Sequence, residues 1–261
     1  MNLSLQGKVA VVCGSSQGIG LATARELADL GATCVLLARD EEALRLAASS
    51  LPNAAGQQHA YFVADFASIQ QVSRVIDEIV STTPVQILVN NTGGPAAGPV
   101  TEATAEAFTA AFSQHLLINH TLVQAVLPSM KRSGYGRIIN IISTSVRIPI
   151  HNLGVSNTVR AAVASWAKTL ANEVGGFHIT VNNILPGYTR TRRLDSLLEV
   201  NAARTGLSRA ELIEAMERSI PLHRFGEPAE IGAVAAFLAS PAASYVNGVS
   251  LPVDGGSTGT I

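Results

Sequence analysis

Apolar residues occur along this chain in short unbroken runs, separated by longer segments in which they recur every three or four positions. The first run covers residues 9–13, and residues 18–30 then show helical spacing that ends at Gly31. The runs lack the polar–apolar alternation of half-exposed strands, so we expect helices to cover both faces of the sheet. The predicted strands are residues 9–13, 33–38, 60–64, 87–90, 137–142, 180–185 and 250–253, and the predicted helices are 18–30, 41–51, 68–82, 102–132, 154–174 and 228–239.

Strands and helices alternate through most of the chain, which favours the α/β class. Right-handed crossovers between parallel strands then predict a doubly wound parallel sheet of Rossmann type with about seven strands. No internal repeat or linker divides the sequence, so a single domain is predicted over residues 1–261. Residues 187–219, before the last helix, show a less regular pattern.

The composition mainly excludes classes of function. Apolar residues make up 47% of the chain, enough for a large core and for subunit contacts, and the formal net charge is −1. Basic residues form only short pairs such as Arg192-Arg193, interpreted here as solvated surface, so neither nucleic acid nor an anionic membrane is an expected partner. No apolar run approaches the about 18 residues of a membrane helix, and no signal-peptide pattern is present, so a cytoplasmic protein is expected.

The two cysteines are expected to be free thiols. Cys13 ends the first predicted strand and Cys34 begins the second. Parallel pairing of these strands would leave the two residues about 13 Å apart, whereas a disulfide needs Cα atoms within about 7 Å. Buried free thiols also agree with a cytoplasmic location.

Three glycines follow the first strand and open the first helix. Gly14, Gly18 and Gly20 would give a tight turn and let the backbone approach a pyrophosphate at the helix N-terminus. A simple cluster of turn glycines is the alternative, but the strand before and the helix after favour a dinucleotide site.

Further motifs occur in a fixed order along the chain. Asn90-Asn91-Thr92-Gly93 follows the fourth strand, Pro186-Gly187 follows the sixth, and residues 220–228 and 253–256 close the sequence. With the glycine motif, these resemble the short-chain dehydrogenase/reductase family, in its ketoacyl-reductase-like branch, over essentially the whole chain. The resemblance implies a nicotinamide dinucleotide cofactor, a homotetramer, a substrate pocket near residues 187–219 and no metal. It also implies these cofactor contacts: Gly14, Ser16, Gly18, Ile19 and Gly20 at the phosphates, Asp65 and Phe66 at the adenine, Asn91 and Gly93 beside the ribose, and Pro186, Gly187, Thr189 and Thr191 at the carboxamide.

Arg39, at the end of the second strand, bears on the choice of cofactor. An acidic residue there would bind a ribose 2′-hydroxyl, whereas a guanidinium suits a 2′-phosphate. Gln17 withholds a second basic residue from the glycine turn, and Asp40 is a rival ligand for the hydroxyl, although capping the next helix is its expected role. NADP(H) is therefore favoured over NAD(H).

The catalytic positions depart from the pattern of the resembled family. The catalytic serine of that family is present here as Ser143. Ser156, thirteen residues later, stands where the family has its catalytic tyrosine, and Arg160 stands where it has its catalytic lysine. His115 stands at the asparagine position, and Thr92 stands where the family usually has an alanine. A serine oxygen lies roughly 4 Å nearer the backbone than a tyrosine oxygen, so it cannot take over the same proton transfer. Arg160 keeps the positive charge and could bind ribose hydroxyls, but an arginine does not release a proton at usable pH.

Two histidines are candidate replacements for the missing proton donor. His115 lies on the long predicted helix, and His151 lies between Ser143 and Ser156, in the segment that rims the pocket in the resembled family. Tyr188 is a weaker candidate, and a lone histidine is more often an ordinary hydrogen-bonding residue.

Three hypotheses follow. The first is an NADP(H)-dependent oxidoreductase for a small carbonyl or alcohol substrate with a substitute proton donor. The second is an impaired relative that binds the cofactor as a sensor or assembly partner. The third is an enzyme of another reaction class on this fold, which no sequence motif supports. Subunit contacts are expected through the helix bearing His115 and the apolar helix bearing Trp166.

Overall fold

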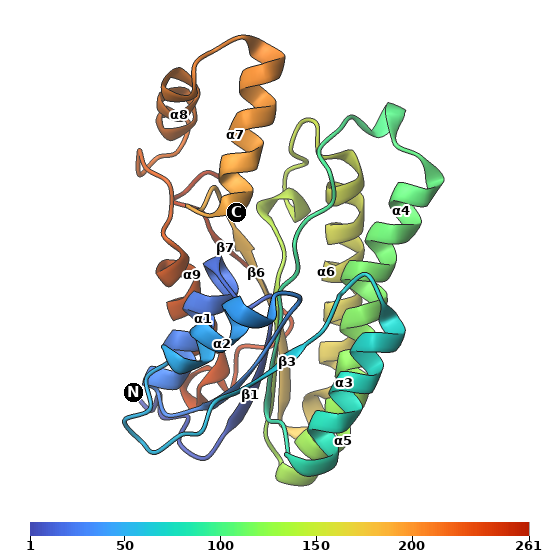
Figure 1. Ribbon diagram of the computed structural model, residues 1–261, viewed down its shortest axis with the longest axis vertical. Coiled ribbons are helices and arrows are strands. Elements are labelled where there is room, and N and C mark those ends of the chain that lie inside the picture. Colours follow the sequence, from blue (N-terminus) through green and yellow to red (C-terminus); the bar gives the residue numbers. More distant parts are fainter. Residues whose placement is uncertain (261) are drawn as a thin grey trace.

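The computed structural model describes residues 1–260 and contains a seven-stranded parallel sheet with helices on both faces (Figure 1). The strand order is β3-β2-β1-β4-β5-β6-β7. The doubly wound Rossmann-type fold predicted from the sequence is therefore confirmed. The strands are β1 (Val9–Cys13), β2 (Thr33–Ala38), β3 (Ala60–Val63), β4 (Ile87–Asn90), β5 (Gly136–Ile141), β6 (Ile179–Pro186) and β7 (Ser250–Val253).

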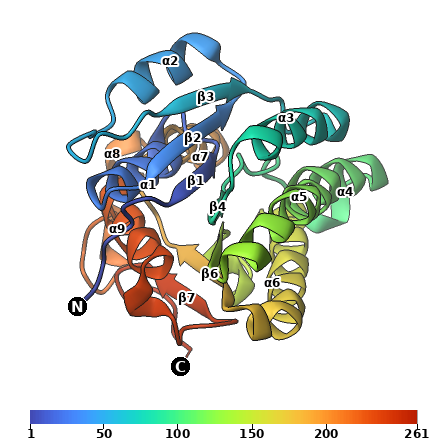
Figure 2. The same cartoon turned by 90° about the horizontal axis from the view of Figure 1, so that it is seen from below.

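The helices form two layers around this sheet. Helices α1 and α9 pack against each other on one face, and α3, α5 and α6 cover the other (Figure 2). The layers fit the fully buried apolar strands, since residues such as Val11 and Val12 point to opposite faces and both are 0% exposed. The helices are α1 (Gly18–Asp29), α2 (Glu41–Ser49), α3 (Ile69–Thr82), α4 (Ala105–Phe112), α5 (Ile118–Ser133), α6 (Gly154–Val174), α7 (Arg192–Thr205), α8 (Arg209–Arg218) and α9 (Pro228–Ala239).

The order of the strands reverses beside β1, which lies between β2 and β4. In open parallel sheets, ligands bind at the carboxyl ends of the strands next to such a reversal. β1 ends at Cys13 and β4 ends at Asn90, so the glycine motif that follows β1 and the Asn90–Gly93 motif at the end of β4 meet at this point.

The cysteines are free and buried, as expected. In the β1–β2 ladder Cys34 lies opposite Ala10, and Cys13 lies opposite Leu37. Burial raises the pKa of each thiol to about 12, so neither is a thiolate near neutral pH.

One long helix over residues 102–132 was predicted, and this is wrong. α4 and α5 are joined by a π-helical segment, Ser113–Leu117, which contains His115. A π turn adds a residue to the helical turn and changes the direction of the side chains around it. His115 is only 1% exposed in this segment. Apolar periodicity did not reveal the break because the residues on both sides remain helical.

The less regular pattern of residues 187–219 conceals two helices, α7 and α8, which rise from one end of the molecule (Figure 1). They enclose a small separate core around Leu194, Leu212 and Phe225. Both helices are rich in charged residues, so their narrow apolar faces were missed. The capping box formed by Ser208 and Glu211 at the start of α8 was a readable signal.

Candidate functional site

The turn over residues 14–20, here called the glycine loop, approaches its neighbours so closely that no side chain fits at Gly14 or Gly20. A Cβ on Gly14 would stand 2.4 Å from the Asn91 carbonyl oxygen, and Gly14 has a φ of +59°. A Cβ on Gly20 would stand 2.2 Å from the Gly14 carbonyl oxygen. Both positions therefore require glycine, as the sequence motif indicated.

The start of α1 fits an anionic group. Gln17 precedes the helix, but its side chain makes no capping hydrogen bond, and the first turn contains no acidic residue. The backbone N–H groups of this turn are thus available, and the helix dipole favours negative charge there. A dinucleotide pyrophosphate suits this arrangement. The predicted phosphate ligands Ser16 and Ile19 are half-buried on the same loop.

Ser15 fixes the glycine loop to the sheet and was not singled out from the sequence. Its side chain is fully buried, donates to the Val12 carbonyl at 2.8 Å and accepts from the Leu37 N–H at 3.1 Å. The position of Ser15 inside the motif, between a strand and a glycine-rich turn, was the available signal.

Asn91 supports the loop from the neighbouring strand. Its Nδ2 donates to the carbonyl oxygens of Cys13 and Gly14, each at 3.2 Å. The side chain expected beside the ribose is therefore engaged with the glycine loop. Gly93, two residues later, is exposed and has open space around its Cα.

The predicted carboxamide segment lies against the glycine loop. Pro186 ends β6, and Thr189 Oγ1 donates to the Gly187 carbonyl at 3.1 Å. The Thr191 methyl carbon lies 3.4 Å from the position of a Cβ on Gly18. The fold thus brings the first and sixth strand ends together, although they are far apart in sequence.

The residues predicted for the adenine end occupy the ends of β2 and β3. Arg39 is exposed and forms no hydrogen bond or ion pair through its side chain within residues 1–260. Asp40 accepts from the Ala43 N–H at 3.0 Å and caps α2, as expected. Asp65 accepts from the Ala67 N–H, whereas the Phe66 side chain is buried in the core, so only its backbone is available to a ligand.

Ser143 follows the end of β5, and Arg160 bonds to the last residue of that strand. Ser143 Oγ accepts from the Ser145 N–H at 3.1 Å. Arg160, on α6, donates from Nη1 to the Ile141 carbonyl at 3.1 Å and is 8% exposed. Burial, and to a smaller extent Arg193, lowers the pKa of Arg160 to about 10, so it is cationic at neutral pH. Ser156 lies one helical turn earlier and is also buried.

His115 bonds to Thr92, another departure from the pattern of the resembled family, in which an alanine is usual. The distance between His115 Nδ1 and Thr92 Oγ1 is 2.7 Å. His115 Nε2 is buried and has no partner among the described residues. Burial, followed by the charges of Arg160 and Arg193, lowers the pKa of His115 to about 3. The imidazole is therefore neutral at pH 7. Thr92, His115, Ser156 and Arg160 are here called the altered centre.

Arg193 approaches the altered centre, and its role was missed. The pair Arg192-Arg193 was interpreted as surface, but Arg193 Nη2 donates to the Pro95 carbonyl at 2.8 Å while its side chain stays accessible. Nitrogens of Arg193 and Arg160 lie 3.5 Å and 3.7 Å from the position of a Cβ on Gly94. Nothing in the sequence links α7 to this loop.

The other candidate proton donors are less enclosed. His151 is exposed on the turn before α6. Tyr188 packs edge-to-face on Phe225, with 6.2 Å between the ring centroids, in the core below α7 and α8.

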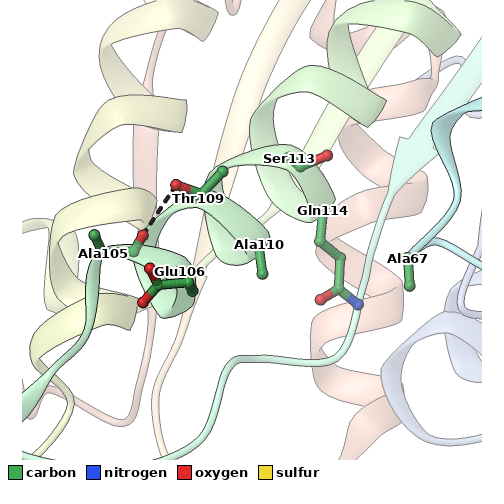
Figure 3. A pocket seen from close by; sticks show the side chains of 7 residues that line it. All are labelled: Ala67, Ala105, Glu106, Thr109, Ala110, Ser113 and Gln114. Carbon is green, nitrogen blue, oxygen red and sulfur yellow. Dashed lines mark hydrogen bonds between the residues drawn. The ribbon is translucent and has the colours of Figure 1, made fainter.

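A separate groove of about 420 Å³ runs along α4 and is not the candidate site (Figure 3). Figure 3 shows mostly small side chains along the helix up to Gln114, and Ala67 beyond Gln114 on a separate segment. It contains none of the predicted site residues; its lining is Ala67, Ala105, Glu106, Thr109, Ala110, Ser113 and Gln114.

No helix within residues 1–260 is both long and apolar enough to span a membrane.

Comparisons with known proteins support the same grouping. A family model described as Enoyl-(Acyl carrier protein) reductase matches residues 14–258. The 3-oxoacyl-acyl-carrier-protein reductase FabG of Pseudomonas aeruginosa is 35% identical over 97% of this chain and 98% of its own length. The structure of L-sorbose reductase from Gluconobacter frateurii, complexed with NADPH and L-sorbose, has a TM-score of 0.93 at 32% identity and covers 100% of both chains. YwfH, an NADPH-dependent reductase involved in bacilysin biosynthesis, has a TM-score of 0.92 at 28% identity, covering 97% of this chain and 99% of its own. With its glycine loop at the reversal of strand order and these matches over nearly its full length, the chain belongs to the short-chain dehydrogenase/reductase family of oxidoreductases.

Proposed function

We propose that the protein is an NADP(H)-dependent oxidoreductase that transfers hydride between the cofactor and a small carbonyl or alcohol substrate, with a proton donor other than tyrosine. The observation that carries this proposal is the glycine loop, where Gly14 and Gly20 leave no room for side chains and the α1 N-terminus is uncapped. The NADPH named with L-sorbose reductase and YwfH supports the same cofactor here.

The preference for NADP(H) rests on Arg39. Its exposed guanidinium follows β2, has no acidic partner within residues 1–260 and is suited to a 2′-phosphate. Asp40, the possible ligand of a 2′-hydroxyl, is engaged in capping α2. The argument for NAD(H), which depends on Asp40 as a ligand of the hydroxyl, is therefore weaker.

The bound cofactor would supply the hydride, and the side chains would orient and polarise the substrate. Ser143 offers a hydroxyl at the end of β5. When Nδ1 of His115 accepts a hydrogen bond from the Thr92 hydroxyl, Nε2 of the neutral imidazole carries the hydrogen and can donate it to a substrate oxygen. A neutral electrophile of this kind polarises a carbonyl without being an imidazolium acid. His151, exposed on the rim, remains the candidate that exchanges protons with solvent.

A cofactor-binding protein with little turnover, acting as a sensor or assembly partner, is the second candidate function. Two observations favour it. Ser156 is too short to replace a tyrosine, and the pKa of His115 lies near 3, too low for a general acid at neutral pH.

A homotetramer is part of the proposal. Phe112, just before the π-helical segment, and Leu117, its last residue, are 41% and 40% exposed, which leaves apolar surface for a partner subunit. His120 and Trp166 meet edge-to-face between α5 and α6, the two helices expected at the interface. Light scattering at micromolar concentration should report a tetramer, and a monomer would contradict this part of the proposal.

Titration of the purified protein with NADPH and NADH, followed by a screen for hydride transfer with carbonyl and alcohol panels, tests the function. Native turnover should fall at least tenfold in His115→Ala or His151→Ala, a barrier increase above about 1.4 kcal/mol. Turnover that both substitutions leave unchanged would exclude the histidine donors. Tight NADPH binding without turnover would favour the binding-protein function, and no cofactor binding would refute both.

A further inference from the structure

Arg160 is a buried charge without an acidic partner. The side chain is 8% exposed, its Nη1 donates to a backbone carbonyl, and it takes part in no ion pair within residues 1–260. Burial of a cation disfavours the charged form unless an opposite charge compensates it. A ligand that brings negative charge would therefore be stabilised here.

Arg193 brings a second positive charge to the same place. It belongs to α7, far from Arg160 in sequence, and reaches across to donate to the Pro95 carbonyl. Guanidinium nitrogens of both residues lie within 3.7 Å of the position of a Cβ on Gly94. Two like charges that converge on a glycine repel each other, and an anion between them would remove that repulsion.

His115 adds an unused polar atom. Its Nε2 is buried without a partner among the described residues, and its Nδ1 bonds to Thr92, two residues before Gly94. Buried polar atoms in native proteins normally have a partner, so an unpaired one in this setting indicates a ligand. Arg160 and Arg193 thus converge at Gly94, and His115 is bonded to the same loop through Thr92.

The anionic parts of the cofactor have other partners. The α1 N-terminus and the glycine loop suit the pyrophosphate, and Arg39 suits a 2′-phosphate. Arg193 instead comes from the region between β6 and α9, where the substrate pocket is expected. Arg160 could also bind ribose hydroxyls, but these carry no charge, so we assign the negative charge that would balance both arginines to the substrate.

We propose that Arg160 and Arg193 form an anion subsite for the substrate of the proposed oxidoreductase, and that this substrate is a carbonyl or hydroxy compound bearing a carboxylate. The planar fork of a guanidinium matches the two oxygens of a carboxylate. That the bound anion is a substrate rests on the proposed function, but the anion subsite itself is testable without turnover.

Calorimetric titration tests the subsite with defined probes. Levulinate and 2-oxobutyrate, each paired with its methyl ester, are titrated into the full chain with and without NADPH. We expect each acid to bind at least tenfold more tightly than its ester. Arg193→Met and Arg160→Gln should each reduce this preference at least tenfold, whereas Arg160→Lys should retain part of it.

Arg192→Met is the matched control, because it removes the same charge from the neighbouring, exposed position of α7. It should keep the acid preference. Because Arg193 is accessible, Arg193→Met tests the subsite even if the Arg160 variant does not fold. Equal binding of acids and esters to the native chain, or an unchanged preference in Arg193→Met, would overturn the proposal.

Two further arms separate the subsite from the cofactor. If Arg193→Met and Arg160→Gln weaken NADPH binding and leave the acid preference intact, the arginines serve the cofactor and the proposal is wrong. Inorganic phosphate that competes with the oxo acids and binds more tightly would overturn the carboxylate class. Acid binding without any NADPH binding would refute the proposed function but support the subsite.

Discussion

The glycine loop and the altered centre lie at the carboxyl end of the same sheet, yet they behave in opposite ways. The loop keeps every residue that its backbone geometry requires, since a Cβ on Gly20 would stand 2.2 Å from a carbonyl oxygen. The altered centre replaces the side chains expected for catalysis, while Arg160 and Ser156 keep their register on α6.

This difference separates binding from chemistry. Cofactor binding at the loop depends on backbone N–H groups and on the absence of side chains, so few substitutions are tolerated. Proton transfer depends on particular side-chain atoms, which one substitution removes. Two of the replaced residues at the altered centre, His115 and Thr92, also bond to each other, which is expected of an alternative site more than of random decay.

The largest expected effect lies at the glycine loop. Gly20→Ala should weaken NADPH binding by on the order of a hundredfold, about 2.7 kcal/mol, because the new methyl group collides with the Gly14 carbonyl. Isothermal titration calorimetry measures the affinity. Gly176→Ala, at a glycine with open space around its Cα, is the control and should bind normally. Unimpaired binding by Gly20→Ala would remove the loop from the cofactor site.

The second prediction restores the expected chemistry at the altered centre. If the native chain has little turnover, Ser156→Tyr combined with Arg160→Lys should raise carbonyl reduction at least tenfold above it, since a general acid contributes about 10²–10⁴ in rate. NADPH consumption with a panel of ketones is the measurement. Ser156→Phe with Arg160→Lys supplies the ring without the hydroxyl and should show no gain. If the two double variants behave alike, the phenol does not reach the substrate.

The third prediction concerns acid stability. The pKa of His115 falls from 6.5 to about 3 on folding, so the unfolded state binds more protons between these values. The contribution of His115 is thus present above pH 6.5 and is lost as the pH falls toward 3, at up to about 1.4 kcal/mol per pH unit. Urea unfolding from pH 7 to 4 should show a shallower loss of stability in His115→Gln.

His151→Gln, which changes an exposed turn residue, is the comparison for that experiment. It should follow the native pH dependence. If the free energy of unfolding of His115→Gln falls as steeply toward acid pH as that of the native chain, His115 is not a buried neutral imidazole in solution.

The smallest expected effect is at Arg39. Arg39→Ala should reduce the preference for NADPH over NADH by several-fold to about tenfold, because one charge-assisted hydrogen bond to a 2′-phosphate would be lost. Affinities for both cofactors are measured side by side. Arg74→Ala, at an exposed position of α3, should leave the ratio unchanged. Equal affinity of the native chain for both cofactors would contradict the assignment.

Several features of the site could be predicted from the sequence because they depend on local patterns. The helix Gly154–Val174 and four of the strands have the predicted bounds, and the glycine motif predicted the tight turn. Asp40 was expected to cap α2 and does so. Helix α8 was missed, although its capping box was readable, because charged residues obscure its apolar face.

The sequence by itself determined the alternation of strands and helices, the family and the positions where the family pattern is broken, because each of these depends on residues close together in the chain. Tertiary structure alone decided that Thr92 contacts His115 and that Arg193 approaches Arg160. The π-helical segment that buries His115 is likewise invisible to apolar periodicity. Contacts between distant segments depend on how whole elements pack, and burial, which sets the pKa of His115 and Arg160, is a property of that packing.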